Sequence, residues 1–438
     1  MSGVLKDKVF IGNVGKLFGS SFIAQLIPFG VLPVLTRIYS PEDFGFWAYF
    51  LSISGIFSIL MTGNYEFAIV LPKDDDEALN VTAGALLITV MFFIAGLIIF
   101  PFFTGITFAL WICVMGLSMA LFRISSYWNN RCNRFGKIGT GNISRSFSAS
   151  AVQLFNGFYF FKNYSGLASG SVIGYMTGTA VQSAGLAGKF ASAKGAVSRK
   201  RILSSASRYK KFPKYFMPAE FLNFVSTSVP VLFLTNLFDA AVTGLYSVPH
   251  KFINTPLTML GSSISQAYFK KTNDLKNAGH DLGYTTADIY KKLLMLGIVP
   301  LSIIAGYGDI IFGFLLGPQW KMSGVYAALL APWMLMVFVA SPISIVFATL
   351  EKQEISLKLN ALLLSVRVLS FVIGGIVFRN ALLAVFLFGA SGFVYWLYFS
   401  FYVIKVSGGS RKDIVLFSVS RLIFIMLPVI LSRSLLNV

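Results

Sequence analysis

Long apolar stretches separated by short polar ones follow each other along almost the whole chain of 438 residues. Each stretch is about as long as the roughly 20 residues that a helix needs to cross a bilayer. The pattern predicts membrane-spanning helices at 11–35, 44–62, 79–100, 106–127, 140–161, 166–188, 215–236, 241–266, 292–316, 324–349, 357–378 and 382–404. A further candidate lies at 413–436, so we expect twelve crossings, or thirteen if that segment also spans the bilayer.

The longest polar interval lies between the sixth and seventh predicted helices. It contains no Asp or Glu, and its basic residues are Lys189, Lys194, Arg199, Lys200, Arg201, Arg208, Lys210, Lys211 and Lys214. Basic runs beside membrane helices mark cytoplasmic loops. We therefore predict an all-α polytopic protein with an N-terminal six-helix bundle at 1–188, a basic cytoplasmic linker at 189–214, a C-terminal six-helix bundle at 215–405 and a tail at 406–438 that holds the last candidate helix.

Composition agrees with a membrane protein. Hydrophobic residues make up 56% of the chain and charged residues 12%, whereas a soluble domain averages about 25% charged residues. A dozen crossings leave no room for a sizeable soluble domain. The net charge of +19 is accounted for by basic inner loops, so we expect no nucleic-acid partner.

The placement of the basic residues also predicts the orientation. With a cytoplasmic N-terminus, most of the 36 Lys and Arg residues fall in inner loops. The outer loops then hold only Arg37, Lys162, Lys321 and Arg379, with Arg433 added if the last segment crosses. This bias is the one that fixes topology in multi-pass proteins. All of the outer loops are short, which leaves no room for an external enzyme site.

Features of enzymes and metalloproteins are missing from the sequence. Cys113 and Cys132 lie in or beside a predicted helix without the spacing of a disulfide framework or a metal site. There is no phosphate-cradling glycine loop and no ATPase motif. We therefore expect a transporter without a metal or other cofactor, driven by an ion gradient, the membrane potential or mass action.

Two local patterns predict a helix boundary and an internal repeat. Ser40-Pro41-Glu42-Asp43 places a capping hydroxyl before a proline and two acids, which predicts that a helix begins near Phe44. Pro33-Val34-Leu35 recurs as Pro230-Val231-Leu232, six predicted helices later. Because that number is even, the copies run the same way through the membrane and predict a pseudo-twofold axis along its normal.

Two blocks of sequence resemble a known family. The first contains Ser40-Pro41-Glu42-Asp43-Phe44-Gly45-Phe46-Trp47 and Asn64-Tyr65-Glu66-Phe67-Ala68-Ile69-Val70-Leu71-Pro72-Lys73-Asp74-Asp75-Asp76-Glu77-Ala78. The second contains Tyr209-Lys210-Lys211-Phe212-Pro213-Lys214-Tyr215, Gly244-Leu245-Tyr246-Ser247, Asn254-Thr255-Pro256-Leu257 and Gly261-Ser262-Ser263-Ile264-Ser265-Gln266. They resemble the polysaccharide-transporter branch of the multidrug/oligosaccharidyl-lipid/polysaccharide exporter superfamily, and within it O-antigen flippases of the Wzx type.

The resemblance implies two six-helix bundles around a central cavity in the bacterial inner membrane. It implies transport of an undecaprenyl-diphosphate-linked oligosaccharide from the cytoplasmic to the periplasmic leaflet, in lipopolysaccharide or related polysaccharide biosynthesis. A polymerase and a chain-length regulator of the same pathway are the implied protein partners, besides membrane lipids. The segment 414–436 departs from the family, which typically ends after twelve helices.

Basic residues inside predicted helices are candidates for binding the diphosphate. A charge near the bilayer centre is costly and usually faces a cavity. Lys251 and Arg367 lie near the middle of their helices, whereas Lys16, Arg123 and Arg145 lie near cytoplasmic ends, where snorkelling to the interface is an equal alternative. Charge-assisted hydrogen bonds from such side chains suit phosphate oxygens.

Polar stripes and acids complete the list of candidates. Asn142, Arg145, Gln153 and Asn156 share one helix face, as do Lys251, Thr255, Thr258 and Ser262. Such stripes face a neighbouring helix or water and not lipid. Glu66, Glu220, Asp309 and His250 are candidates for ion or proton coupling, with charge balance as the alternative for the acids.

Two other functions remain open from the sequence. A multidrug antiporter of the same superfamily is the first, although cationic drugs would favour buried acids over the buried bases found here. A membrane polysaccharide polymerase is the second, although it would be expected to carry a large periplasmic loop.

Overall fold

The computed structural model describes residues 2–192, 195, 197–278, 281–350 and 353–435. Side chains are described from residue 19 onward within these ranges, except at 191, 192, 266, 270, 273, 277, 348, 353–358, 360, 411, 413, 430 and 433–435. Every regular element in these ranges is helical. The chain divides into two compact units, Met1–Ser228 and Val229–Val438.

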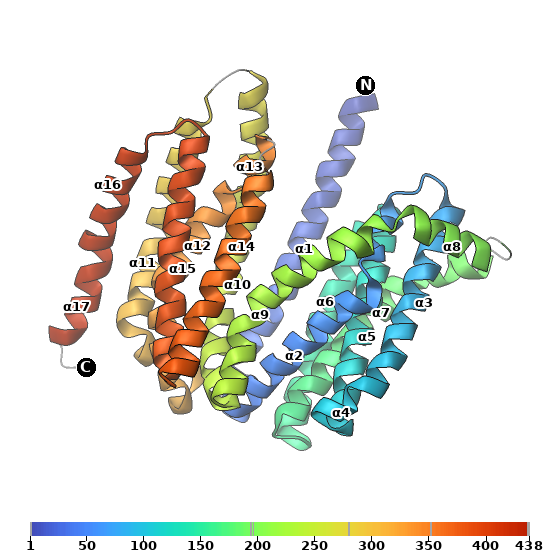
Figure 1. Cartoon of the computed structure of the whole chain (residues 1–438), viewed down its shortest axis with the longest axis horizontal. Coiled ribbons are helices and arrows are strands. Elements are labelled where there is room, and N and C mark those ends of the chain that lie inside the picture. The colour runs from blue at the N-terminus through green and yellow to red at the C-terminus, as the bar shows by residue number, and fades with distance from the viewer. Residues whose placement is uncertain (1, 193–194, 196, 279–280, 351–352, 436–438) are drawn as a thin grey trace. The chain divides into compact units, whose positions relative to one another are not determined.

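Among the described residues, the first unit contains seven helices of ten residues or more before the division, which falls inside α9. The helices are labelled in Figure 1. Its elements are α1 (Ser2–Ile38), α2 (Pro41–Thr62), the 3₁₀ helix η1 (Tyr65–Val70), α3 (Asp75–Ile99), α4 (Pro101–Thr104), α5 (Ile106–Arg131), α6 (Phe135–Tyr159), α7 (Tyr164–Ser192), α8 (Arg199–Arg208), the π-helical turn η2 (Phe212–Phe216) and α9 (Met217–Leu237).

The second unit continues from α9. Its elements are α10 (Ala240–Asn277), α11 (Gly283–Leu316), η3 (Pro318–Trp320), α12 (Lys321–Ile343), α13 (Val346–Thr349), α14 (Gln353–Phe371), the π-helical turn η4 (Val372–Val377), α15 (Ala381–Val406), α16 (Arg411–Arg421), the π-helical turn η5 (Leu422–Met426) and α17 (Leu427–Leu435).

The predicted all-α polytopic fold is confirmed. A helix covers each segment that hydrophobicity predicted, and the last candidate is the run α16–η5–α17. Among the described residues, eight helices are long and apolar enough to span a membrane, and Ala361–Val377 and Ile414–Val429 are shorter apolar helices. The helices α6, α7 and α10 fall short of that apolar level because glycine and polar residues interrupt them. The predicted domain bounds and twofold relation stay predictions.

The predicted start of α2 has the geometry that its sequence indicates. The Ser40 hydroxyl accepts a hydrogen bond from the Asp43 amide at 3.2 Å, and the Asp43 carboxylate accepts one from the Ser40 amide at 2.9 Å. This reciprocal pair satisfies two backbone donors that a helix start leaves free. Asp239 caps α10 in a similar way, accepting from the Val242 amide at 2.6 Å.

A glycine every fourth residue lets α7 lie directly against α6. Gly166, Gly170, Gly174 and Gly178 share one face of α7. A Cβ atom at Gly174 would lie 2.6 Å from the Arg145 carbonyl oxygen and 2.7 Å from the Ala149 Cβ. The small residues therefore bring the two backbones into contact, as in other closely packed membrane helices.

The polar stripe of α6 bonds to the same face of α7. The Gln153 amide donates to the Leu167 carbonyl oxygen at 3.0 Å, and the Asn156 amide donates to the Ser169 hydroxyl at 2.8 Å. Of the two environments expected for this stripe, a neighbouring helix is therefore the one observed for these two residues. They hold α6 against α7 within the membrane.

Replacing Gly174 with Leu is expected to lower the free energy of unfolding by about 3 kcal/mol, because overpacking must separate the two backbones. The melting temperature of the detergent-solubilised protein measures the effect. Gly188 lies on the same helix and has no atom within 4 Å of a built Cβ. Gly188→Leu is therefore the matched control, and equal melting of the two variants would contradict the packing account.

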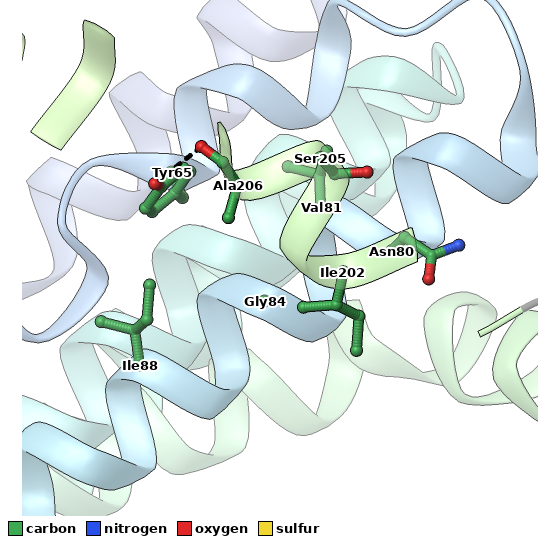
Figure 2. Close-up of a pocket in the computed structure, with 8 residues that line it drawn as sticks. All are labelled: Tyr65, Asn80, Val81, Gly84, Ile88, Ile202, Ser205 and Ala206. Carbon is green, nitrogen blue, oxygen red and sulfur yellow. Dashed lines mark hydrogen bonds between the residues drawn. The ribbon is translucent and has the colours of Figure 1, made fainter. Parts of the chain in front are cut away.

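Part of the basic linker forms a helix docked on the start of α3. Ser198 caps α8, and Ile202, Ser205 and Ala206 of α8 face α3 across a cavity of about 10 Å³ (Figure 2). The Tyr65 hydroxyl donates to the Ala206 carbonyl oxygen at 3.1 Å, which is drawn in the same view. The linker is thus partly ordered by packing and not only a solvated loop.

Ion pairs fix the linker to the acidic end of α3. The Asp75 carboxylate lies 3.1 Å from both Arg131 and Lys189, and Glu77 lies 2.7 Å from Arg208. The acids of the motif at 74–77 therefore bind basic side chains of α5, α7 and α8. They also lie at the positive end of α3, which favours acidic residues.

In the second unit, α11 packs closely on α12 and carries the C-terminal helical run on another side. The Tyr290 hydroxyl lies 2.8 Å from that of Ser418, and the Tyr307 hydroxyl lies 2.7 Å from that of Ser432. The partners are separated by nearly the same number of residues in both pairs, so α16–η5–α17 runs parallel to α11.

Candidate functional site

Two carboxylates and one arginine meet inside the first unit. Arg123 of α5 lies 2.5 Å from a carboxylate oxygen of Glu66 on η1 and 3.1 Å from one of Glu220 on α9. Glu66 is fully buried, whereas the side chain of Glu220 is 28% exposed. The guanidinium also lies 5.8 Å from the ring centroid of Phe67. The sequence put all three ionisable residues on the candidate list without indicating that they meet.

Asn64 joins the cluster through its unusual backbone. Its φ of 56° lies in the left-handed region, which Asn adopts more readily than most residues. The Asn64 side chain donates to Glu220 at 2.6 Å and accepts from Arg123 at 3.2 Å. Sequence reasoning missed this role, although an Asn after Gly63 at a helix end was an available signal.

The cluster carries one more negative than positive charge when both acids are ionised. Burial raises the pKa of the Glu66 carboxyl, while the charge of Arg123 opposes that rise. A single proton on Glu66 would make the group neutral. The arrangement can therefore hold a proton at a buried position beside the partly exposed Glu220.

Arg145 lies elsewhere in the first unit, between aromatic rings. Its guanidinium donates to the Tyr175 hydroxyl at 2.9 Å and lies 4.8 Å and 5.2 Å from the ring centroids of Tyr175 and Phe122. These contacts join α6 to α5 and α7. Arg123 and Arg145 therefore have different surroundings, one acidic and one aromatic.

The second unit places His250 inside an aromatic stack. Its ring lies 5.6 Å from that of Tyr246 and 5.8 Å from that of Trp333, both nearly parallel to it. Trp333 meets Phe388 edge to face at 4.9 Å. The guanidinium of Arg367 lies 5.9 Å from the Phe388 ring centroid.

Beside this stack, α10 and α12 enclose a groove of about 410 Å³. Its polar lining residues are Asn254, Thr258, Ser262, Ser265, Ser341 and Ser344, and its apolar ones include Leu257, Met334, Val337 and Phe338. The lining residues described by the structure include no charged side chain. We call this feature the hydroxyl groove.

The hydroxyls of the groove donate back to their own helices. Thr258 donates to the Asn254 carbonyl oxygen at 2.9 Å, Ser262 to that of Met259 at 3.0 Å and Ser344 to that of Ser341 at 2.6 Å. Each hydroxyl has a single hydrogen, so its oxygen lone pairs remain as acceptors. The side-chain amide of Asn254 adds donors to the same surface.

Lys251 is exposed on α10, one turn before the hydroxyl groove. Its spacing from Asn254, Thr258 and Ser262 places all four on one helix face. Two members of the predicted stripe, Thr258 and Ser262, line the groove, whereas Lys251 and Thr255 do not. That Lys251 and Arg367 share one pocket stays a prediction.

The remaining candidates lie apart from these groups. Asp309 is 6% exposed at the close crossing of α11 and α12, where a Cβ at Gly308 would lie 2.6 Å from the Gly324 carbonyl oxygen. Lys16 lies on α1, but its side chain is outside the described residues. The roles assigned to both residues stay predictions.

Comparisons with known proteins give a family and a fold. A family model described as "Polysaccharide biosynthesis protein" matches residues 34–324. No curated protein sequence matches the chain. Among solved structures, the fold is similar to "Lipid II flippase MurJ, inward closed conformation", with a TM-score of 0.69 and 16% identity over 95% of this chain and 92% of that one.

Two MATE transporters share the fold less closely. One is described as an inward-facing multidrug resistance MATE family transporter of the MOP superfamily, with a TM-score of 0.58 and 14% identity over 90% of this chain and 99% of that one. The other is a mutant of the MATE transporter VcmN from Vibrio cholerae, with a TM-score of 0.52 and 15% identity over 90% and 97% of the two chains.

Proposed function

We propose that this chain, which belongs to the polysaccharide biosynthesis protein family, is a flippase that moves a diphosphate-linked oligosaccharide across the membrane on its lipid carrier. The carrier we propose is undecaprenyl diphosphate, and the direction is from the cytoplasmic to the periplasmic leaflet of a bacterial inner membrane. The lipid tail stays in the bilayer while the head group crosses. This is transport alone, so no covalent bond is made or broken. Polymerisation would be the task of a separate protein of the same pathway.

The hydroxyl groove is the observation that carries this proposal. A multi-pass helix bundle has little reason to line a groove of about 410 Å³ with hydroxyls and an amide unless a polar molecule enters it. Sugar hydroxyls both donate and accept, so they match an amide and oxygen acceptors better than they match charges. Phe338 offers a flat ring to the face of a sugar, and Leu257 and Met334 add apolar surface beside it.

The diphosphate calls for basic groups near the groove. Lys251 lies on the same face of α10, one turn from Asn254, and its ammonium can donate three hydrogen bonds to phosphate oxygens. We propose that sugars enter the groove while the diphosphate lies toward Lys251. Arg367, Arg145, Arg123 and Lys16 remain further candidates for contacts to the diphosphate along its path.

A multidrug antiporter is the second candidate, because two MATE transporters share the fold. The acids of the first unit weigh against it. Glu66 and Glu220 both lie against Arg123, which leaves at most one uncompensated negative charge in the cluster for a cationic drug. We propose that this cluster instead holds the coupling proton, with Asp309 and His250 as the other coupling candidates.

Filling the hydroxyl groove tests the proposed function. Thr258→Trp is expected to slow flipping about tenfold or more, because the indole occupies the space that the sugars would enter. A tenfold change corresponds to about 1.4 kcal/mol of free energy. The assay uses the purified chain in vesicles with a fluorescent polyprenyl-diphosphate oligosaccharide and measures the fraction that becomes accessible on the far side.

Leu260→Trp is the matched control, because Leu260 is 47% exposed on the same helix and does not line the groove. It should flip the lipid at the wild-type rate. Equal rates for both Trp variants would discredit the groove as the sugar site. Failure of the wild-type chain to move the lipid, with proton-driven export of a cationic dye, would favour the antiporter.

A further inference from the structure

Two basic side chains of the second unit share one aromatic ring. The Lys291 ammonium on α11 lies 5.5 Å from the ring centroid of Phe417, and the guanidinium of Arg421 lies 5.2 Å from it. Phe417 and Arg421 both belong to α16, which packs on α11. A ring face attracts one cation, but two like charges beside the same ring also repel each other.

No carboxylate balances these charges among the described residues. Lys291 and Arg421 form no ion pair there, and the acid nearest in sequence to Lys291, Asp288, is bound to Lys292 at 2.7 Å. Within the part of the chain whose side chains are described, the two bases therefore form a cationic pair without an acidic partner. Arg421 is exposed and Lys291 half-buried, so an anion from outside the chain can reach the pair and offset the repulsion between the two cations.

The position of Arg421 indicates where that anion comes from. Arg421 lies within the apolar helical stretch Ile414–Val429, where Leu416 and Phe424 are each 74% exposed. A helix with such a surface faces hydrocarbon, and a cation there is costly unless it reaches the head groups. Phe417 lies one turn back toward the start of α16, so the contact draws the guanidinium toward that end.

Lys291 lies at the matching level of the neighbouring helix. The contact between Tyr290 and Ser418, together with the parallel run of the two helices, sets Lys291 beside Phe417. Lys291 therefore lies in the early part of α11, and Arg421, the last residue of α16, reaches back to the same level through its contact with Phe417. The basic loops before these helices are the ones that the sequence predicts to be cytoplasmic.

We infer that Lys291, Phe417 and Arg421 form a binding site for the head-group phosphate of an anionic phospholipid. The guanidinium and the ammonium donate charge-assisted hydrogen bonds to the phosphate oxygens. The ring of Phe417, which lies close to both cations, holds them in position for this contact. The acyl chains of the lipid lie along the exposed apolar side chains of α16. This site is separate from the hydroxyl groove and does not depend on the proposed transport.

Lipid retention by the purified full-length chain tests the site. Phosphatidylglycerol and phosphatidylcholine are each titrated into the detergent-solubilised protein, and native mass spectrometry measures the lipid that remains bound. The double variant Lys291→Gln/Arg421→Gln is expected to bind phosphatidylglycerol about 30-fold more weakly, with about fivefold from each base. Binding of the neutral phosphatidylcholine should stay unchanged.

Lys292→Gln is the matched control, since it removes a neighbouring charge that is already bound to Asp288. It should retain phosphatidylglycerol as the wild type does. Arg421→Lys keeps the charge and should also retain it, while the melting temperature of each variant reports on folding. Because each single Gln variant is also expected to weaken binding, the test survives if the double variant misfolds.

Three results would overturn the inference. Undiminished phosphatidylglycerol binding by the single and double Gln variants is the first, and an equal loss in Lys292→Gln is the second. Displacement of phosphatidylglycerol by inorganic phosphate at equal concentration is the third, because the site would then select a free anion and not a lipid.

Discussion

Replacing Arg123 with Ala is expected to lower the free energy of unfolding by about 3–5 kcal/mol, the largest loss of stability expected from a single substitution here. The reason is that the variant leaves Glu66, which is fully buried, without its cation. Removing one partner of a buried pair exposes the full desolvation cost of the other. Thermal melting of the detergent-solubilised protein measures the loss.

The pH dependence of this variant gives the effect a specific signature. Burial raises the pKa of the Glu66 carboxyl and Arg123 opposes the rise, so the variant shifts the pKa further upward. A raised pKa in the folded state stabilises the fold below the unfolded-state pKa, and this stabilisation is lost as pH rises through the folded-state pKa. The Arg123→Ala variant should therefore melt highest at acid pH and lower as the solution becomes alkaline.

Two further variants separate charge from packing. Glu66→Gln in the Arg123→Ala background should restore part of the stability and remove the pH dependence. Arg145→Ala removes an arginine that contacts rings and a tyrosine hydroxyl, so it should cost only about 1–2 kcal/mol. Equal melting of the two Ala variants at every pH would show that Arg123 does not compensate a buried charge.

The largest effect on transport is expected from Lys251. If its ammonium binds the diphosphate beside the hydroxyl groove, Lys251→Gln removes a charge-assisted contact worth about 1.5–3 kcal/mol, which is about 10–100-fold in the flipping rate. Because the side chain is exposed, the melting temperature should hardly change. The vesicle flipping assay measures the rate.

Lys271→Gln provides the comparison, since Lys271 is an exposed lysine further along the same helix. It should leave flipping unaffected, and Lys251→Arg should keep most of it. Wild-type flipping by Lys251→Gln would remove Lys251 from the substrate path while leaving the groove test with Thr258→Trp independent.

The helices could be predicted because the bilayer leaves the backbone few alternatives. A chain in hydrocarbon must satisfy its own hydrogen bonds, so long apolar stretches become helices almost without regard to tertiary contacts. The start of α2 could also be predicted, because Ser40 and Asp43 are close in sequence and form the capping hydrogen bonds with each other. These are local properties of the chain.

The contacts of the candidate site are not local. Arg123 is 59 residues from Asn64 and 97 from Glu220, and no periodicity within one helix indicates such a meeting. The hydroxyl groove combines local and non-local features. The polar stripe on α10 predicted Thr258 and Ser262, but it could not predict that Ser341 of α12 and Ser344 just after α12 lie opposite them. The spacing of Ile202 and Ala206 after Ser198 was a local signal for α8 that the high charge of the linker obscured.

The glycine face of α7 has a consequence for motion. Gly174 leaves no room for a Cβ beside the Arg145 carbonyl oxygen. Sliding α7 along α6 by one residue would bring a larger side chain to that position, so the close contact resists shear between the two helices. The hairpin of α6 and α7 should therefore move as one rigid body during any conformational change. Bending must then be concentrated at segments such as the proline-containing helix α9 or the π-helical turns η2 and η4, where the hydrogen-bond ladder is already irregular.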